Sequence, residues 1–147
     1  MKELTKTVTT TEVTGYEAFD GTVFQSKEEC RKYETSAATV AKQAAWHYLV
    51  ADRGEYDLFR YDDVGLLIFD VPDIKAFGII ANWANLCGVW DANRFTPDYV
   101  GKRVGFYQTC GDFEFVPEFA TKEAMLTYFT KHIEDLYRDA DPKEVQA

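Results

Sequence analysis

The residues of this chain best suited to chemistry are its scarce cations and the aromatic side chains among them. A guanidinium can hold a phosphate through two hydrogen bonds, and an aromatic ring can stack on a base. Together they would furnish a pocket for a small nucleotide. The alternative is that the arginines pair with surface carboxylates, because acidic residues outnumber basic ones by 25 to 16. The cations and rings concerned are Arg53, Arg60, Arg94, Lys102, Arg103, Tyr61, Trp83, Trp90, Phe95, Phe106 and Tyr107.

A specific pocket can be predicted from this set. Arginines would hold the phosphates, aromatic rings would stack the base, and an asparagine amide would read the edge of the base. The predicted ligand-binding residues are Arg60, Trp83, Asn85, Arg94, Arg103 and Tyr107.

Catalytic and metal chemistry find little support in the sequence. Of the two serines, Ser26 is expected to cap a helix, and neither histidine has a partner at metal-ligand spacing. The acidic pairs are expected in a turn and on an exposed helical face. We therefore predict no enzyme, no catalytic residue, no metal site and no cofactor. The groups considered are His47, His132, Asp62-Asp63 and Glu134-Asp135.

Local signals predict the elements that would position the pocket. Asp20-Gly21 predicts a two-residue hairpin turn between strands at 5–16 and 22–24. Ser26 and Glu29 form a capping box for a helix that is expected to continue to about Val50. Later strands are predicted at 55–61 and 64–71, followed by a helix at 73–87 and a hairpin at 102–116. A last helix is predicted to be capped by Thr121. Its apolar stripe consists of Met125, Leu126, Phe129, Ile133 and Leu136.

The order of these elements defines the predicted fold class. It is α+β, with three successive β-hairpin–helix units around a mainly antiparallel sheet. Residues 1–138 are predicted to form a single α+β domain, followed by a polar C-terminal tail at 139–147.

Charge and composition limit the possible partners. The net charge of −9 disfavours binding to duplex nucleic acid. It suits either a solubilising surface or a negative face that attracts a basic protein. No apolar run is long enough to cross a membrane, and three cysteines favour a reducing compartment. We therefore expect no membrane association and a location in the cytoplasm of the host cell.

The helix at 73–87 is apolar on two faces. One face would pack on the sheet, and the other, with Ile79, Trp83 and Leu86, would pack on a second subunit. This pattern predicts a homo-oligomer. The alternative is that residues 89–101 of the same chain cover this helix.

The segment at 16–34 also carries a resemblance. Its pattern Y-x-A-x-D-G-T-x-F followed by S-x-E-E-C-x-x-Y-E resembles the opening of many small bacteriophage proteins. More loosely, the chain is similar to the Thoeris anti-defence sponge proteins of phages, which are of comparable size. That family is not enzymatic and sequesters signals of the cyclic ADP-ribose and cyclic oligonucleotide type. The resemblance assigns no ligand-binding residue in this chain.

These observations give two expected functions. The first is a non-enzymatic phage anti-defence protein that binds and sequesters a nucleotide-derived immune signal. The alternative is an acidic protein–protein inhibitor of a basic host defence protein such as a nuclease.

Overall fold

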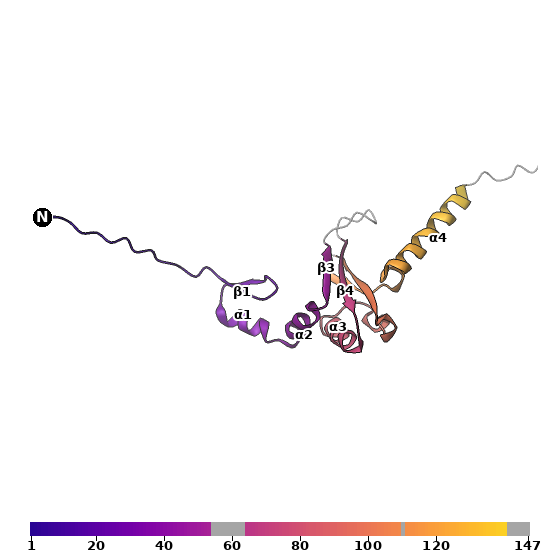
Figure 1. Cartoon of the computed structure of the whole chain (residues 1–147), viewed down its shortest axis with the longest axis horizontal. Coiled ribbons are helices and arrows are strands. Elements are labelled where there is room, and N and C mark those ends of the chain that lie inside the picture. Colours follow the sequence, from indigo (N-terminus) through magenta and orange to yellow (C-terminus); the bar gives the residue numbers. More distant parts are fainter. Residues whose placement is uncertain (54–63, 110, 141–147) are drawn as a thin grey trace, which may run out of the picture. The chain divides into compact units, whose positions relative to one another are not determined.

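The computed structural model describes residues 1–53, 64–109 and 111–140 (Figure 1). The chain forms two compact units, Met1–Val40 and a second unit from Ala41 onward. The division falls within the helix α2 (Ala37–Trp46). We describe each unit by itself.

The first unit contains a small hairpin and a short helix. Strands β1 (Tyr16–Glu17) and β2 (Val23–Phe24) pair antiparallel and precede α1 (Lys27–Glu34). The predicted strand is much shorter than expected, because residues 1–15 form an extended segment without regular secondary structure (Figure 1).

The turn of this hairpin also differs from the prediction. The amide of Ala18 donates to the carbonyl of Thr22 at 2.8 Å, and the amide of Gly21 donates to the carbonyl of Ala18 at 3.0 Å. Gly21 has a φ of 85°. The loop therefore has three residues and ends in a left-handed glycine, whereas a two-residue turn was expected.

The single helix predicted from Ser26 to about Val50 is wrong. Ser26 does cap α1, since its hydroxyl accepts a hydrogen bond from the amide of Glu29 at 3.4 Å. The helix ends at Thr35, whose hydroxyl donates to the carbonyl of Arg31 at 2.8 Å. Ser36 then accepts from the amide of Thr39 at 3.2 Å, at the start of α2. These two hydroxyl side chains compete with continuous helical hydrogen bonding and divide the segment into two helices.

The second unit is built on a four-stranded antiparallel sheet in the order β3-β4-β5-β6. The edge strand β3 begins inside the helix that was predicted to continue to about Val50, because its β-formers pair with β4. The strand predicted at 55–61 lies outside the described residues. The sheet strands are β3 (Leu49–Arg53), β4 (Val64–Val71), β5 (Lys102–Thr109) and β6 (Asp112–Glu114).

Helix α3 (Ile74–Leu86) covers one face of this sheet. Asp73 caps it by accepting from the amide of Ala76 at 2.8 Å. The indole of Trp83 lies 5.2 Å from the Phe69 ring and 5.4 Å from the Phe106 ring, measured between centroids, and Trp83 is only 1% exposed. This aromatic cluster forms the core of the unit.

The segment after α3 closes over the same core. It contains the short 3-10 helices η1 (Ala92–Arg94) and η2 (Pro97–Tyr99), and Phe95 packs 4.8 Å from the ring of Phe77 on α3. The alternative expected from the sequence, that residues 89–101 cover this helix, is therefore what the structure shows. Because Trp83 is a core residue, it cannot form the subunit surface that was predicted for it.

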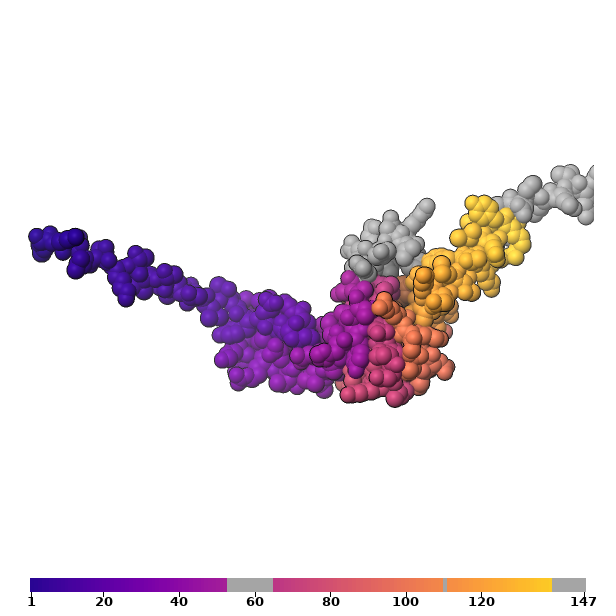
Figure 2. All heavy atoms as spheres, in the orientation of Figure 1, coloured from indigo at the N-terminus to yellow at the C-terminus, as the bar shows by residue number. Residues whose placement is uncertain are grey.

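A last helix, α4 (Lys122–Ala140), follows the 3-10 helix η3 (Pro117–Phe119). Thr121 caps α4 as predicted, since its hydroxyl accepts from the amide of Ala124 at 3.1 Å. Only the first turns of α4 pack against η3, and the remainder extends away from the sheet (Figures 1 and 2). The helix reaches two residues into the predicted polar tail, whose remaining residues lie outside the described ranges.

The α+β class and the antiparallel sheet are confirmed. Three hairpin–helix units around one sheet are not clearly seen, because the first hairpin forms its own two-stranded sheet and α2 adds a helix. Among the described helices, none combines the length and hydrophobicity needed to traverse a bilayer.

Candidate functional site

A hollow in the second unit lies on the face of the sheet that α3 does not cover. It has a volume of about 1100 Å³ and is bounded by β3, β4, β5, η3 and the first turns of α4. We call it the groove. Its principal lining residues are Val50, Leu66, Ile68, Lys102, Arg103, Gly105, Phe119, Thr121, Lys122, Glu123, Met125, Leu126 and Phe129.

The alternation of side chains along β4 and β5 creates this site. Leu67 and Phe69 face the core, so Leu66 and Ile68, which alternate with them, face the groove. Val104 is completely buried on the core side, whereas its neighbour Arg103 reaches the open side. One pair of strands therefore supplies both an aromatic core and the floor of a groove.

Gly105 brings the base of α4 close to the sheet. Its amide donates to the carbonyl of Ala120 at 2.7 Å, immediately before the cap of α4. A Cβ at this position would lie 2.8 Å from Cδ1 of Leu66. The absence of a side chain thus allows Leu66 and the start of α4 to approach the same point of β5.

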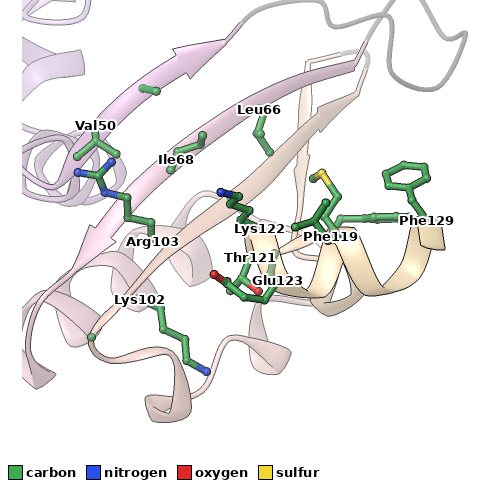
Figure 3. Close-up of a pocket in the computed structure, with 16 residues that line it drawn as sticks. Val50, Leu66, Ile68, Lys102, Arg103, Phe119, Thr121, Lys122, Glu123 and Phe129 are labelled. Carbon is green, nitrogen blue, oxygen red and sulfur yellow. The ribbon is translucent and has the colours of Figure 1, made fainter. Parts of the chain in front are cut away.

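The groove has a cationic part and an aromatic part. Figure 3 shows Arg103 and Lys122 directed over the sheet from β5 and α4, whereas Phe119 and Phe129 lie together beside α4. Lys102 lines the groove but points away from the sheet (Figure 3). An anion could be held near the two cations while an apolar or aromatic group contacts the floor and the rings.

One carboxylate stands opposite Arg103 in the sheet. Asp70 of β4 stands opposite Arg103 in the register of the antiparallel pair, and both residues face the open side. Side chains opposite each other in such a pair lie about 5 Å apart at Cβ and interact directly. Asp70 therefore places one negative charge near the position of Arg103.

A second, smaller hollow of about 420 Å³ adjoins the groove, and both are lined by Lys102 and Thr121. It contains Arg94, which forms an ion pair with Glu118 at 3.6 Å. Both side chains are about half exposed, so the pair adds little stability. For Arg94 the structure favours the alternative of pairing with a surface carboxylate.

The two tyrosines near these hollows are neutral at physiological pH. Burial raises the pKa of the Tyr107 phenol. Burial also raises the pKa of Tyr99. The nearby charge of Arg94 lowers this pKa and that of Glu118 raises it, but burial has the largest effect. Neither phenol therefore contributes a negative charge that would repel an anionic ligand.

The structure does not gather the six predicted ligand-binding residues into one pocket. Trp83 is in the core, so its predicted stacking on a base is corrected. Asn85 is exposed on α3, on the other side of the sheet from Arg103. Tyr107 faces the open side but is 7% exposed and lies under Phe119, with ring centroids 5.5 Å apart.

Of the remaining three, Arg103 lines the groove and Arg94 lines the smaller hollow. Arg60 lies outside the described residues. Of the predicted residues, Arg103 therefore lines the groove. The aromatic residues that line it are Phe119 and Phe129, which were not predicted.

The sequence reasoning missed Lys122, Phe119 and Phe129 as groove residues. Two signals could have found them. The apolar run of β4 still alternates between two faces, which predicts a second apolar face at Leu66 and Ile68. The Thr121 cap also places Lys122 at the start of a helix that follows directly after β6 and η3.

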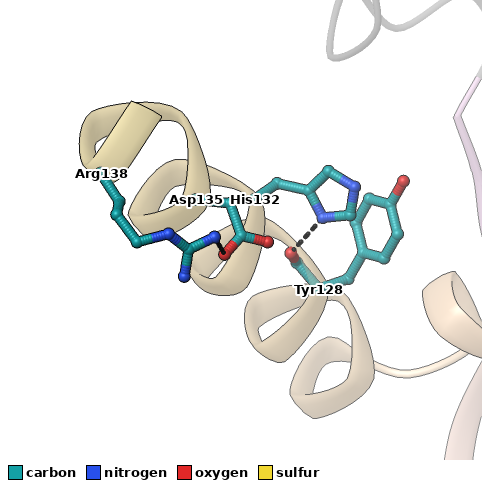
Figure 4. A network of polar contacts seen from close by, with 4 residues as sticks. All are labelled: Tyr128, His132, Asp135 and Arg138. Atoms are coloured by element: carbon teal, nitrogen blue, oxygen red, sulfur yellow. Dashed lines mark hydrogen bonds and ion pairs between the residues drawn. The ribbon is translucent and has the colours of Figure 1, made fainter. Parts of the chain in front are cut away.

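The polar side chains of His132, Asp135 and Arg138 make contacts within α4 itself. The imidazole of His132 stacks on the ring of Tyr128 at 3.9 Å, and its Nδ1 lies 3.0 Å from the carbonyl oxygen of Tyr128 (Figure 4). Arg138 donates to Asp135 at 2.6 Å (Figure 4). In the part of the chain that the structure describes, histidine, cysteine and acidic residues form no cluster of three or more that could hold a metal ion.

Comparisons of the chain with protein-family models, with characterised proteins and with solved structures give no match. The function must therefore be inferred from the groove and from the sequence itself.

Proposed function

We propose that the protein is a non-enzymatic bacteriophage anti-defence protein that binds and sequesters a nucleotide-derived signal in the groove. The signal would be of the cyclic ADP-ribose or cyclic oligonucleotide type. The observation that carries the proposal is the position of Arg103 and Lys122, which extend from separate elements over an apolar floor. The phage origin is supported by the resemblance of residues 16–34.

The charge distribution supports an anionic ligand. The whole chain has a net charge of −9, yet the groove is lined by Lys102, Arg103 and Lys122 against one acid, Glu123, among its lining residues. Local positive charge on an acidic protein attracts a small anion while the rest of the surface repels duplex nucleic acid.

The size and shape of the groove fit the same ligand class. Small-molecule sites commonly measure roughly 300–1000 Å³, so a groove of about 1100 Å³ suits a ligand with two nucleotide units. Arg103 would bind phosphate as a fork, Lys122 would neutralise it, and Phe119 or Phe129 would contact a base.

Isothermal titration with a panel of cyclic nucleotides tests this proposal. The wild type should bind at least one member, and Arg103→Gln with Lys122→Gln should abolish that binding. Lys131→Gln is the matched control, because Lys131 is an exposed lysine of the same helix outside the groove. The absence of binding across the panel would refute the proposal.

A second candidate function is inhibition of a basic host protein. Trp90 is 66% exposed and is followed by Asp91, and its backbone pairs with that of β6 at Glu114. An exposed tryptophan on an acidic protein can serve as the anchor of a contact with a basic protein. A stoichiometric basic protein retained by the wild type and lost with Trp90→Ala would favour this alternative.

A further inference from the structure

The extended part of α4 carries an apolar seam. Its members Leu126, Phe129, Ile133 and Leu136 are spaced by three, four and three residues, which aligns them along one side of the helix. Leu126 is 58% exposed, Ile133 is 54% exposed and Leu136 is 67% exposed. Isolated apolar side chains on a surface are common, but a continuous exposed line of them marks a contact site.

Within the described part of the second unit, α4 packs against η3 at its beginning. Phe119 of η3 contacts the rings of Tyr128 and Phe129, at centroid distances of 4.5 and 6.0 Å. Beyond these contacts, Ile133 and Leu136 continue the seam along the part of α4 that extends away from the sheet (Figure 1). The later half of the seam is therefore exposed along a helix whose start packs against η3.

We infer that a second copy of this chain docks on the seam, with α4 against α4, to form a homodimer. A narrow seam with a three–four spacing matches another helix with the same spacing, since knobs of one helix fit holes of the other. Two identical seams also satisfy the self-complementarity that a two-fold axis requires. The homo-oligomer expected from the sequence is thus proposed at α4 in place of α3.

The charges around the seam favour a second copy over a basic partner. The positions that flank its middle carry Thr130, His132 and Tyr137, and in the helical repeat the acidic residues Glu123 and Asp139 flank only its two ends. Two acidic chains can therefore approach at the middle of the seam without like charges meeting. The carboxylates of Glu134 and Asp135 lie away from the seam in the helical repeat. A basic protein would need those carboxylates at the contact.

The size of the seam sets the expected affinity. Leu126, Ile133, Leu136 and the adjacent Tyr137, which is 69% exposed, present together on the order of 400 Å² per chain. With the polar flanks of both helices, the interface would bury on the order of 1000 Å² in total, the lower end for specific complexes. The dimer should therefore dissociate in the micromolar range.

The seam and the groove share Leu126 and Phe129. A partner helix on the seam would therefore border the groove. The inference does not require a bound nucleotide, so it stands or fails separately from the proposed function.

Sedimentation velocity of the full chain across the micromolar range tests the dimer. The wild type should shift from monomer to dimer with concentration, and Ile133→Glu with Leu136→Glu should remain monomeric. Lys131→Glu is the matched control, because it makes the same change of −2 in net charge on the opposite side of α4. It should still dimerise.

Circular dichroism of each variant verifies that α4 is retained. If the double glutamate variant loses helix, Leu136→Asn replaces it and should raise the dissociation constant at least tenfold. A wild type that stays monomeric throughout, or a dimer that survives the seam substitutions, would overturn the inference. So would assembly only with a different protein.

Discussion

On one face of the four-stranded sheet, Phe69 and Phe106 enter an aromatic core under α3; on the other, Leu66, Ile68 and Arg103 of the same strands line a groove. The first face excludes water and is closed by several rings, whereas the second is only partly covered by the start of α4. Alternation along a strand makes this division possible without any change in backbone. The first face stabilises the unit, and the second is available to bind.

The largest expected effect is on the core face. Trp83→Ala removes a 1% exposed indole that contacts several rings, and should lower the free energy of unfolding by about 3–5 kcal/mol. Trp90→Ala, at 66% exposure, should change it by less than about 0.5 kcal/mol. Urea denaturation of both variants measures the difference, and equal losses would contradict the assignment of Trp83 to the core.

The next effect concerns binding at the groove face. Arg103→Gln should lower the affinity for a cyclic nucleotide by about ten- to a hundredfold, since a hydrogen bond to a charged group contributes roughly 1.5–3 kcal/mol. Arg103 is exposed, so stability should change little. Calorimetric titration and urea denaturation separate the two quantities. A large loss of stability with unchanged affinity would assign Arg103 to the fold alone.

The two faces also differ in how well the sequence alone predicts them. The α+β class, the Thr121 cap and the hairpin at 102–116 follow from short-range signals, and the structure bears them out. Trp83 was misassigned because an aromatic residue at helical spacing looks the same whether its helix faces a ligand or a core. The groove depends on register between β4 and β5, which only the folded sheet defines.

A smaller effect on stability compares Gly105 of β5 with Gly78 of α3. Gly105→Ala places a Cβ within 2.8 Å of Leu66 and should destabilise the protein by about 1 kcal/mol while pushing Leu66 into the groove. Gly78→Ala, on the exposed side of α3 with nothing within 4 Å, should stabilise it by about 0.5–1 kcal/mol. Thermal unfolding of both variants tests the opposite signs. Stabilisation by Gly105→Ala would show that Leu66 yields without cost.

The smallest effect sharpens the electrostatic part of the comparison. Asp70→Asn removes the carboxylate opposite Arg103 in the sheet register and should tighten nucleotide binding by about two- to fivefold, because a nearby negative charge that repels the anion is lost. The free energy of unfolding should change by less than about 0.5 kcal/mol. Asp91→Asn, an exposed acid outside the groove, provides the control. Weaker binding by Asp70→Asn would mean that Asp70 orients Arg103 for the ligand.

The central claim is that the open face of the sheet is the ligand site. Nuclear magnetic resonance titration of the isotope-labelled full chain with cyclic ADP-ribose and cyclic dinucleotides tests it most directly. We predict that one ligand shifts the amide signals of Ile68, Arg103 and Lys122 while that of Asn85 stays in place. Saturating ligand that leaves these three signals unchanged, or shifts only residues of α3, would contradict the account.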